Sequence, residues 1–566
     1  MSQTDSRQSP PLRAQNPATN PADSNAALPW WHGAAIYQIY PRSFADSNGD
    51  GIGDLAGITA RLDHVARLGA DAIWISPFFT SPMRDFGYDV ADYCDVDPVF
   101  GTLADFDALV ARAHDLGLKV TIDQVYAHTS DQHPWFVASR QSRDNPYADW
   151  YVWEDPKPDG SPPSNWQSVF GGPAWRWDAR RCQYYLHNFL AEQPQVNAHN
   201  PAVQQAILDV MRFWLDRGVD GFRIDALNFL MHEPSLRDNP PAPDDGRRRT
   251  RPFDYQLKLY NQSHADIVPF VERLRALCDS YGAIFTVAEV GGDQAELEMK
   301  AYTAGSTRLN SAYGFDFLYA DRITPAMVRD VLARWPDEPG MGWPSWAFEN
   351  HDAPRAISRW TRPDTHPDMR DAHARMKAVL FAALRGNIIV YQGEELGLTQ
   401  VEIPFELLQD PEAIANWPLT LSRDGARTPL PWQAEGAMGG FTEGETPWLP
   451  LGEENLARAV DRQEADPASI LSLTTRLLHL RRTCPPLRHG SFDVLHADEA
   501  VLAVRRMHEG KAVLAVLNMS DQTCPWPEGL PPHAAVPHTA VLVAENGAAP
   551  GAPLPAYAAL IVEEPA

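Results

Sequence analysis

The chain has 566 residues, of which 44% are hydrophobic and 10% aromatic, so it can bury a large apolar core. Its net charge of −26 would repel nucleic-acid phosphates and anionic lipid head groups, which argues against both as partners. No stretch approaches the roughly 18 consecutive apolar residues that a membrane-spanning helix requires.

Residues 1–29 are polar and rich in proline, and they lack the apolar segment of a secretory signal. We therefore expect a disordered N-terminal tail and a cytoplasmic protein. The five cysteines are scattered without CxxC spacing, which indicates neither a zinc site nor a disulfide framework. Free, mostly buried thiols are expected.

From residue 30 onward, short apolar runs alternate with longer amphipathic segments, a pattern typical of β–α units around a parallel sheet. Eight such units close a barrel, so the predicted fold class is α/β, a (β/α)8 TIM barrel with an insertion domain and a C-terminal all-β domain. The eight predicted strands are 34–44, 71–79, 118–128, 219–227, 283–292, 311–319, 344–352 and 387–395.

The pattern also predicts domain boundaries. The barrel is expected over 30–128 and 191–486, interrupted after its third strand by an insertion domain, 129–190, that is rich in Trp, Pro and Gly. A long irregular segment, 232–254, follows the fourth strand and is predicted to be a lid loop. Short alternating strands over 487–566 predict a β-sandwich.

The loop after the first strand, DSNGDGIGDLAG (46–57), resembles half of a calcium-binding loop. It is not an EF-hand, because position twelve is Gly57 and a strand precedes the loop. A cation site and a metal-free Gly-Asp turn both remain open at this point. The candidate ligands are Asp46, Asn48, Asp50, the carbonyl of Ile52, and Asp54.

Polar side chains gather at the ends of four predicted strands, where the reacting groups of a βα barrel lie. A single acid at a strand end is more often a cap or a loop ligand. Three acids and two histidines together suit glycoside hydrolysis, in which one carboxylate attacks the anomeric carbon and one carboxylic acid protonates the leaving oxygen. The three acids are Asp225, Glu289 and Asp352, and the histidines are His128 and His351; Asp123 and Arg223 lie at the same strand ends.

Four of these stretches, DQVYAH, GFRIDAL, AEVGG and FENHD, stand in the order of the four main motifs of the α-amylase superfamily, glycoside hydrolase family 13. The sequence resembles that family over residues 30–566. SPMRDFGYD, NWQSVFGGPAW and SRDGARTPLPW further resemble α-glucosidases of the oligo-1,6-glucosidase and maltose-hydrolysing type.

The resemblance implies residue roles. Asp225 would be the nucleophile, Glu289 the general acid/base, and Asp352 the carboxylate that holds the 2- and 3-hydroxyls of the sugar. Asp85 and Arg427 would grip the 4-hydroxyl end and close the pocket, which makes the enzyme exo-acting. Further contacts to the glucose are expected from Tyr88, His128, Phe170, Arg223 and His351.

The predicted function is a retaining α-glucosidase acting on short α-1,4-glucosides such as maltose. Ala226 supports the predicted preference for α-1,4 linkages, because a small residue after the nucleophile accompanies α-1,4 preference in related enzymes. The loop 232–254 would limit substrate length. Two alternatives stay open: a transglucosylase or isomerase acting on sucrose or trehalose, and a non-catalytic barrel, which the retained carboxylates disfavour.

The resemblance also bears on metals and partners. It implies that the 46–57 loop binds a structural Ca²⁺ or Mg²⁺, with no organic cofactor. Ala127 stands where amylases carry a calcium-ligating asparagine, so a second calcium between barrel and insertion is expected to be absent. The expected partner is a small oligosaccharide, and the expected assembly is a monomer or homodimer.

Overall fold

The computed structural model describes residues 28–566 except 245, 247, 248, 339, 363, 364, 421, 531–539, 565 and 566. All but the last two residues of the predicted disordered tail, 1–29, lie outside the described residues. None of the helices in the described part combines the length and apolar character that crossing a membrane requires.

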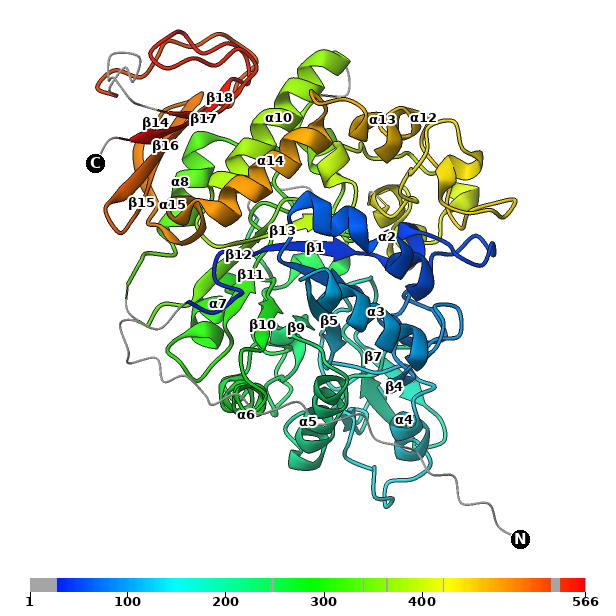
Figure 1. The fold of residues 1–566 in the computed structure, drawn as a ribbon. Helices are drawn as coiled ribbons and strands as arrows, with labels where there is room; N and C mark the ends of the chain where they lie inside the picture. Colours follow the sequence, from blue (N-terminus) through cyan, green and yellow to red (C-terminus); the bar gives the residue numbers. More distant parts are fainter. Residues whose placement is uncertain are drawn as a thin grey trace.

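Eight parallel strands form a closed barrel in the order β1-β13-β12-β11-β10-β9-β5-β2 (Figure 1). Every predicted strand supplies one of them, which confirms the TIM barrel. Barrel strands are buried on both faces, so their sequences are nearly continuous apolar runs. For this reason they could be predicted from the sequence. The strands are β1 (Ala35–Ile39), β2 (Ala72–Ile75), β5 (Lys119–Val125), β9 (Gly221–Asp225), β10 (Phe285–Glu289), β11 (Ser311–Tyr313), β12 (Trp343–Ala347) and β13 (Asn387–Tyr391).

At least one helix follows each barrel strand along the chain. These helices surround the barrel and bury their apolar faces against it. They are α2 (Leu55–Leu68), α3 (Leu103–Asp115), α5 (Pro201–Asp216), α6 (Ile267–Asp279), α7 (Ala295–Thr303), α8 (Pro325–Ala333), α10 (Pro367–Ala383) and α14 (Ile470–Thr483).

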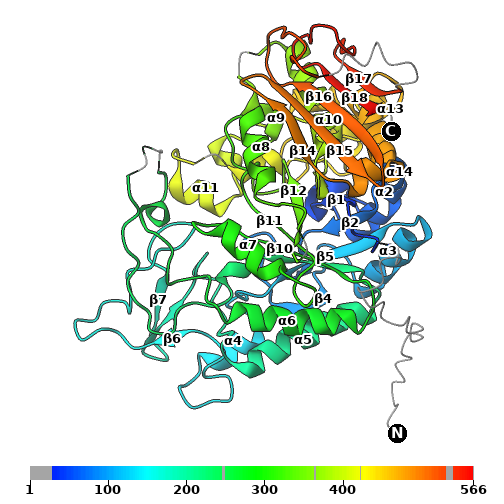
Figure 2. The same cartoon turned by 90° about the vertical axis from the view of Figure 1, so that its left-hand side faces the viewer.

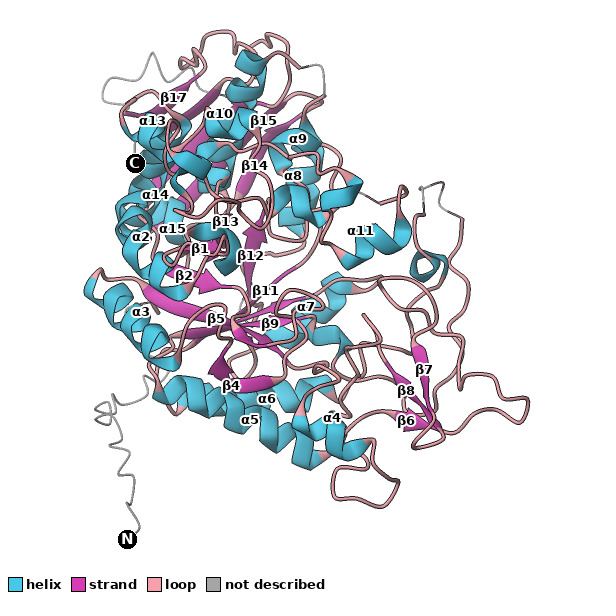
Figure 3. Ribbon diagram, turned by 90° about the vertical axis from the view of Figure 1, so that its right-hand side faces the viewer, coloured by secondary structure: helices cyan, strands magenta, loops and turns pink. Residues whose placement is uncertain are grey.

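Two excursions of the chain rise from the C-terminal ends of the barrel strands. A short antiparallel pair, β3 (Phe79–Thr80) and β4 (Asp92–Val96), carries the loop that contains the SPMRDFGYD motif. The insertion between β5 and α5 contains α4 (Pro134–Ser139) and a three-stranded sheet. Figures 2 and 3 show this sheet on the same side of the barrel as α11 (Pro411–Asn416). The strands of the insertion sheet are β6 (Trp153–Glu154), β7 (Trp175–Asp178) and β8 (Gln183–Leu186).

The C-terminal region is a single antiparallel sheet in the order β14-β15-β16-β18-β17. One face of the sheet packs against helices α10 and α15 (Pro485–His489), and the other face is covered by its own connecting loops. The prediction of a β-sandwich is therefore corrected within the described residues, because helices supply the second layer. The strands are β14 (Asp493–Ala497), β15 (Val501–His508), β16 (Lys511–Asn518), β17 (Val541–Glu545) and β18 (Ala559–Glu564).

The five cysteines are all free, as predicted. Only Cys278 is buried, however, while Cys182 is exposed and the other three are intermediate. The expectation of mostly buried thiols was wrong: Cys94 lies on a half-buried position of β4, Cys484 caps the end of α14, and Cys182 and Cys524 lie in connecting segments.

Candidate active site

Arg223 occupies the centre of the polar cluster at the C-terminal ends of the barrel strands. It lies on β9, and its Cα is in register with that of Asp123 on the neighbouring β5. Its Nη1 donates to Asp123 Oδ1 at 2.8 Å and to Asp225 Oδ1 at 2.6 Å, and its Nη2 lies 2.7 Å from Glu289 Oε2. One fully buried guanidinium therefore holds three carboxylates from three adjacent strands.

Asp225 and Glu289 are poised to exchange a proton near neutral pH. Burial raises the pKa of each carboxyl to about 7, although the charge of Arg223 opposes the shift. Asp225 accepts a short hydrogen bond from Arg223, whereas Glu289 accepts its hydrogen bond from the Tyr313 hydroxyl at 3.1 Å, and Arg223 Nη2 is not aligned to donate to it. The hydrogen bonds therefore stabilise a negative charge better on Asp225 than on Glu289.

Asp352 remains ionised although it lies in the same buried environment. Burial opposes its ionisation, but His351, Arg423 and Arg427 hold the pKa of its carboxyl well below its usual range. His351 is itself neutral at pH 7, because burial lowers its pKa to about 3. At that pH the positive charge around Asp352 therefore comes from the two arginines, whose nitrogens lie 3.2 Å and 2.8 Å from Asp352 Oδ1.

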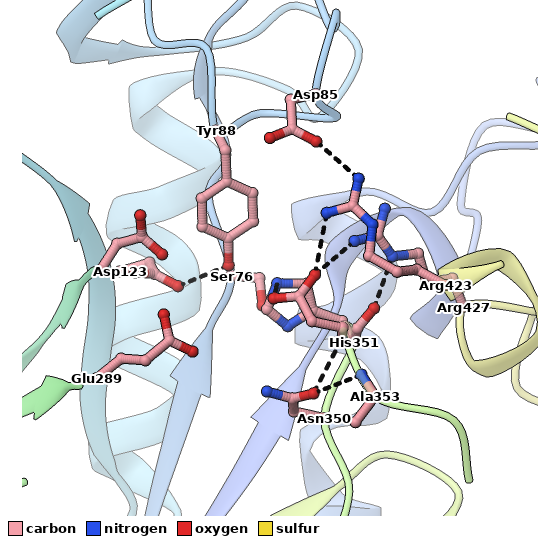
Figure 4. Close-up of polar contacts among 12 residues, drawn as sticks. Ser76, Asp85, Tyr88, Asp123, Glu289, Asn350, His351, Ala353, Arg423 and Arg427 are labelled. Carbon is pink, nitrogen blue, oxygen red and sulfur yellow. Dashed lines mark hydrogen bonds and ion pairs between the residues drawn. The ribbon is translucent and has the colours of Figure 1, made fainter. Parts of the chain in front are cut away.

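Tyr88 and His351 form one wall of the site (Figure 4). Their rings are stacked with centroids 5.3 Å apart and planes 3° from parallel. The Tyr88 hydroxyl donates to Asp123 Oδ2 at 3.0 Å, and Gln38 Nε2 donates to His351 Nδ1 at 2.9 Å. The proton of His351 is thereby placed on Nε2, which lies 3.1 Å from Asp352 Oδ2.

Asp85 and Arg423 close one end of the site. Arg423 Nη2 lies 3.0 Å from Asp85 Oδ1 and 2.8 Å from Asp410 Oδ1, and the guanidinium lies 5.0 Å from the centre of the Phe170 ring. The Asp85 carboxylate comes from the β3–β4 loop, and Figure 4 shows it facing the two arginines.

Arg427 does not take the place predicted for it. It is fully buried, donates from Nε to the His351 carbonyl at 2.7 Å and pairs through Nη2 with Asp352. The residue that pairs with Asp85 is Arg423, four positions earlier in the same SRDGARTP motif. Arg427 thus helps to hold the Asp352 carboxylate in place.

His128 lies at the same end of the site. Its Nε2 donates to the Tyr88 carbonyl at 2.9 Å, so its unprotonated Nδ1, which has no hydrogen-bond partner, is available as an acceptor. Burial lowers the pKa of His128 to about 4, which keeps the ring neutral. Gln193, from the insertion, donates to Asp85 Oδ2 at 3.1 Å and fixes the second carboxylate oxygen.

These groups surround a cavity of about 370 Å³. Part of its wall comes from the predicted lid loop, because Arg251, Phe253 and Asp254 line it. Arg251 Nη1 lies 3.0 Å from Glu412 Oε1 on α11, which joins the loop to the opposite rim. The other lining residues are Asp85, Tyr88, His128, Val169, Phe170, Phe189, Asp225, Ala226, Asn228, Phe229, Lys258, Gln262, Glu289, Gly291, Gly292, Phe315, Tyr319, Asp352 and Arg423.

The predicted cation loop lies between β1 and α2, apart from the residues of the cavity. Hydrogen bonds from Thr442 and from backbone amides lower the pKa of Asp46, although partial burial opposes the shift. Asp46 is therefore anionic, and Asn48 and Asp50 are exposed oxygen donors, a set that suits a hard cation. Asp54 fits less well, because its carboxylate caps α2 through Gly57 N and also accepts from Ser47.

Three residues of the site were not assigned a role from the sequence. Tyr313, on β11, bridges Arg223 and Glu289, and its position in a short apolar run gave no signal. Gln193 lies in an irregular segment of the insertion. Arg423 was within a motif already singled out, but two arginines in that motif could not be distinguished without their partners.

The comparisons with known proteins agree with this geometry. The family model described as alpha-amylase, catalytic domain, matches residues 38–490. A probable alpha-glucosidase of Rhizobium meliloti is 53% identical over 87% of this chain and 90% of its own length. An oligo-1,6-glucosidase of Parageobacillus thermoglucosidasius is 36% identical over 87% and 91%, respectively. The crystal structure of an alpha-glucosyl transfer enzyme, 48% identical, superposes with a TM-score of 0.89 over 95% of this chain and 100% of that one.

The barrel, the carboxylates at its strand ends and the family model that spans most of the chain lead to one conclusion. The chain belongs to the α-amylase family, glycoside hydrolase family 13, and it is a glycoside hydrolase.

Proposed function

We propose that the protein is a retaining, exo-acting α-glucosidase that releases α-glucose from the non-reducing end of short α-1,4-glucosides such as maltose. The observation that carries this proposal is the asymmetric pair on adjacent strands. Asp225 and Glu289 contact the same Arg223, yet their hydrogen bonds favour a carboxylate at Asp225 and a carboxylic acid at Glu289. Two carboxyl groups in these states are what a double displacement needs.

In the first step the Asp225 carboxylate attacks the anomeric carbon while Glu289 donates its proton to the glycosidic oxygen of the leaving sugar. The carbon–oxygen bond to the leaving group breaks as a covalent glucosyl ester forms. In the second step the Glu289 carboxylate takes a proton from water, and the resulting hydroxide oxygen displaces Asp225. Two inversions restore the α-configuration.

Asp352 and His351 would bind the ring during both steps. Asp352 is kept anionic by two arginines, so it can accept hydrogen bonds from adjacent sugar hydroxyls and stabilise positive charge that develops at the anomeric carbon. His351 Nε2, 3.1 Å from Asp352 Oδ2, is a neutral donor that helps to orient this carboxylate.

The closed end supports exo-action. The Asp85–Arg423 ion pair, with Phe170 against the guanidinium, leaves a polar surface for the last sugar and stands where a further residue of a chain would have to continue. The cavity of about 370 Å³ is small on the scale of ~300–1,000 Å³ that ligand pockets span, which favours a disaccharide.

The linkage preference rests on Ala226, which lines the cavity next to Asp225. Its methyl group leaves room beside the nucleophile where the second sugar has to lie, whereas a branched side chain would narrow that space. This feature supports α-1,4-glucosides as substrates.

Transfer of glucose to a second sugar is a further activity that we propose for the same site. The cavity is lined by five phenylalanines, Phe170, Phe189, Phe229, Phe253 and Phe315, against which an acceptor ring can pack. Hydrolysis and transfer share the glucosyl-enzyme and differ only in the acceptor. The 48% identity to an enzyme described as transferring α-glucosyl groups supports this addition.

Two accessory properties are proposed on separate grounds. The 46–54 loop would hold a structural Ca²⁺ or Mg²⁺ through Asp46, Asn48, Asp50 and the Ile52 carbonyl, and this ion would supply stability and no chemistry. The free state of all five cysteines supports a reducing compartment such as the cytoplasm.

The test of the proposed function is proton NMR of the sugar first released from maltose. We expect α-glucose, which later mutarotates, and oligosaccharide products should grow with maltose concentration if transfer competes. Asp225→Asn should abolish turnover, and Glu289→Gln should retain activity best on glucosides with good leaving groups. β-Glucose as the first product would overturn the proposal.

A further inference from the structure

A second cluster of potential ligands lies outside the active site, at the N-terminal ends of α5 and α6. One ligand atom each from His199, His264 and Asp266 lies within 4.8 Å of the others. Asp266 Oδ2 is 3.5 Å from His199 Nδ1 and 3.5 Å from His264 Nδ1. No motif of the sequence connects these residues, because the fold brings together segments more than 60 positions apart.

The hydrogen bonds around the cluster leave its inner atoms unprotonated. His199 Nε2 donates to the His232 carbonyl at 2.8 Å, so in the neutral ring Nδ1 carries a lone pair. The backbone amide of Asp266 donates to His264 Nδ1 at 3.3 Å, so that nitrogen is also unprotonated, and a metal ion bound to it would replace this long hydrogen bond. His199, whose second ring nitrogen donates to a carbonyl, has the usual arrangement of a ligating histidine.

Asp266 shows a second, independent feature. It is the N-cap residue of α6, yet its side chain makes no capping hydrogen bond. Its carboxylate instead lies beside the two imidazoles. Three atoms bearing lone pairs therefore converge, and the only donor that a hydrogen bond among the described residues places beside them is the Asp266 backbone amide, 3.3 Å from His264 Nδ1, so a bound cation would stabilise the arrangement.

We propose that His199, His264 and Asp266 form a binding site for a divalent transition-metal ion, with Zn²⁺ as the best match. Bonds of about 2.0–2.2 Å in a tetrahedron place the ligand atoms about 3.3–3.5 Å apart, which agrees with the 3.5 Å from Asp266 Oδ2 to Nδ1 of each histidine. Two imidazoles and one carboxylate disfavour Ca²⁺ and Mg²⁺, which prefer oxygen ligands. The fourth position is left for water.

The site would join both ends of the segment that contains the lid loop. His199 holds the carbonyl of His232 at the start of this segment, and the backbone amide of His264 donates to the Met231 carbonyl at 3.2 Å at its end. A metal ion that bridges His199 and His264 would therefore restrain the base of the segment against the start of α5, and local opening there would become rarer.

The test uses untagged full-length protein, stripped with a chelator and kept in excess Mg²⁺ so that hard-oxygen sites are filled. Zn²⁺ is titrated in competition with a chromophoric indicator, and Co²⁺ is added separately to record the visible absorption of a tetrahedral site. We expect one Zn²⁺ per chain and slower hydrogen exchange of the Glu233 and His264 amides when it is bound.

Two substitutions address different ligands, so failure of one to fold leaves the other informative. His264→Gln and Asp266→Asn should each weaken Zn²⁺ binding more than about tenfold, while maltose hydrolysis and circular dichroism stay unchanged. The matched control is His366→Gln, because His366 Nδ1 also lies 3.5 Å from a carboxylate oxygen, that of Asp368, but His366 is not in a three-residue cluster. Absence of saturable Zn²⁺ binding, or equal affinity in all four proteins, would overturn the proposal.

Discussion

Arg423 Nη2 lies 3.0 Å from Asp85 Oδ1 although 338 positions separate the two residues in the chain. The same guanidinium also contacts Asp352 and Asp410, so one side chain connects the closed end of the cavity with a carboxylate predicted to bind substrate. This arrangement depends on the planar fork of arginine, which can serve several acceptors in fixed directions.

Arg423→Lys should lower kcat/KM for maltose about 100-fold, because a lysine keeps the charge but cannot hold three carboxylates in place. Steady-state kinetics on purified protein measures the effect, and Asp85→Asn should produce a loss in the same direction. Arg482→Lys, at a half-exposed arginine near Asp71, is the matched control and should retain full activity. Wild-type kinetics for Arg423→Lys would show that the closed end does not contact substrate.

Glu289→Gln should make the folded protein more stable at neutral pH. The pKa of Glu289 is raised from 4.5 in its ordinary state to about 7 in the folded protein, chiefly by burial. The folded state thus binds the proton more tightly than the unfolded state, and the stability that this contributes is lost as pH rises from about 4.5 through about 7. At pH 8 the wild-type enzyme carries a cost of a few kcal/mol that the variant lacks.

Differential scanning calorimetry between pH 5 and 8 checks this expectation. The Tm of Glu289→Gln should exceed that of the wild type at pH 8, and the difference should shrink toward pH 5. A constant difference across that range would mean that Glu289 has an ordinary pKa. In the wild-type enzyme, activity should have a bell-shaped dependence on pH. Its two apparent pKa values belong to Asp225 and Glu289 jointly.

Ala226→Val should shift the linkage preference from maltose toward isomaltose and also reduce stability. Ala226 has φ of +39° and ψ of +47°, a left-handed conformation that is strained for a β-branched residue. We expect a loss of about 1–3 kcal/mol in the free energy of unfolding. Ala226→Gly is the control, since glycine accepts this conformation without adding a branch. An unchanged ratio of kcat/KM for the two disaccharides would dismiss the role of this position.

Arg251→Ala should raise activity on maltotetraose relative to maltose. The Arg251–Glu412 ion pair fastens the lid loop to α11, and both residues line the cavity. Without it the loop can move and admit a longer chain. Arg237→Ala is the control, because it removes an ion pair with Glu233 that lies in the same segment but away from the cavity. Its ratio of activity on maltotetraose to activity on maltose should equal that of the wild type. If wild-type enzyme already cleaves maltotetraose as well as maltose, the lid does not limit length.

Removal of divalent cations by a strong chelator should lower the Tm by a few degrees while leaving the activity of the folded enzyme nearly intact, because the cation loop is remote from the cavity. Asp50→Ala should reproduce the loss and abolish the response to added Ca²⁺ or Mg²⁺. Asp144→Ala, at another exposed aspartate, serves as the control. Identical melting curves with and without chelator, together with a negative elemental analysis, would exclude the ion.

Most of the barrel could be predicted because local sequence and local structure agree there. Strands such as Phe285–Glu289 are mostly apolar, and their acidic residue falls at the C-terminal end. The order of the strand-end acids was readable for the same reason. The C-terminal strands were also predicted from their alternation, but alternation shows only that a face is buried, and helices α10 and α15 cover it here.

The sequence by itself determined the fold class, the strand ends that carry the candidate catalytic carboxylates and the family, because each of these depends on short-range patterns. Only the tertiary structure decided which of two arginines four positions apart meets Asp85, since Arg423 and Arg427 have the same chemistry and differ only in what lies opposite them. The convergence of His199 and His264 was likewise invisible, because it arises from the packing of two helix starts on neighbouring barrel units. Local patterns specify what a residue can do, and long-range packing specifies the partner with which it does so.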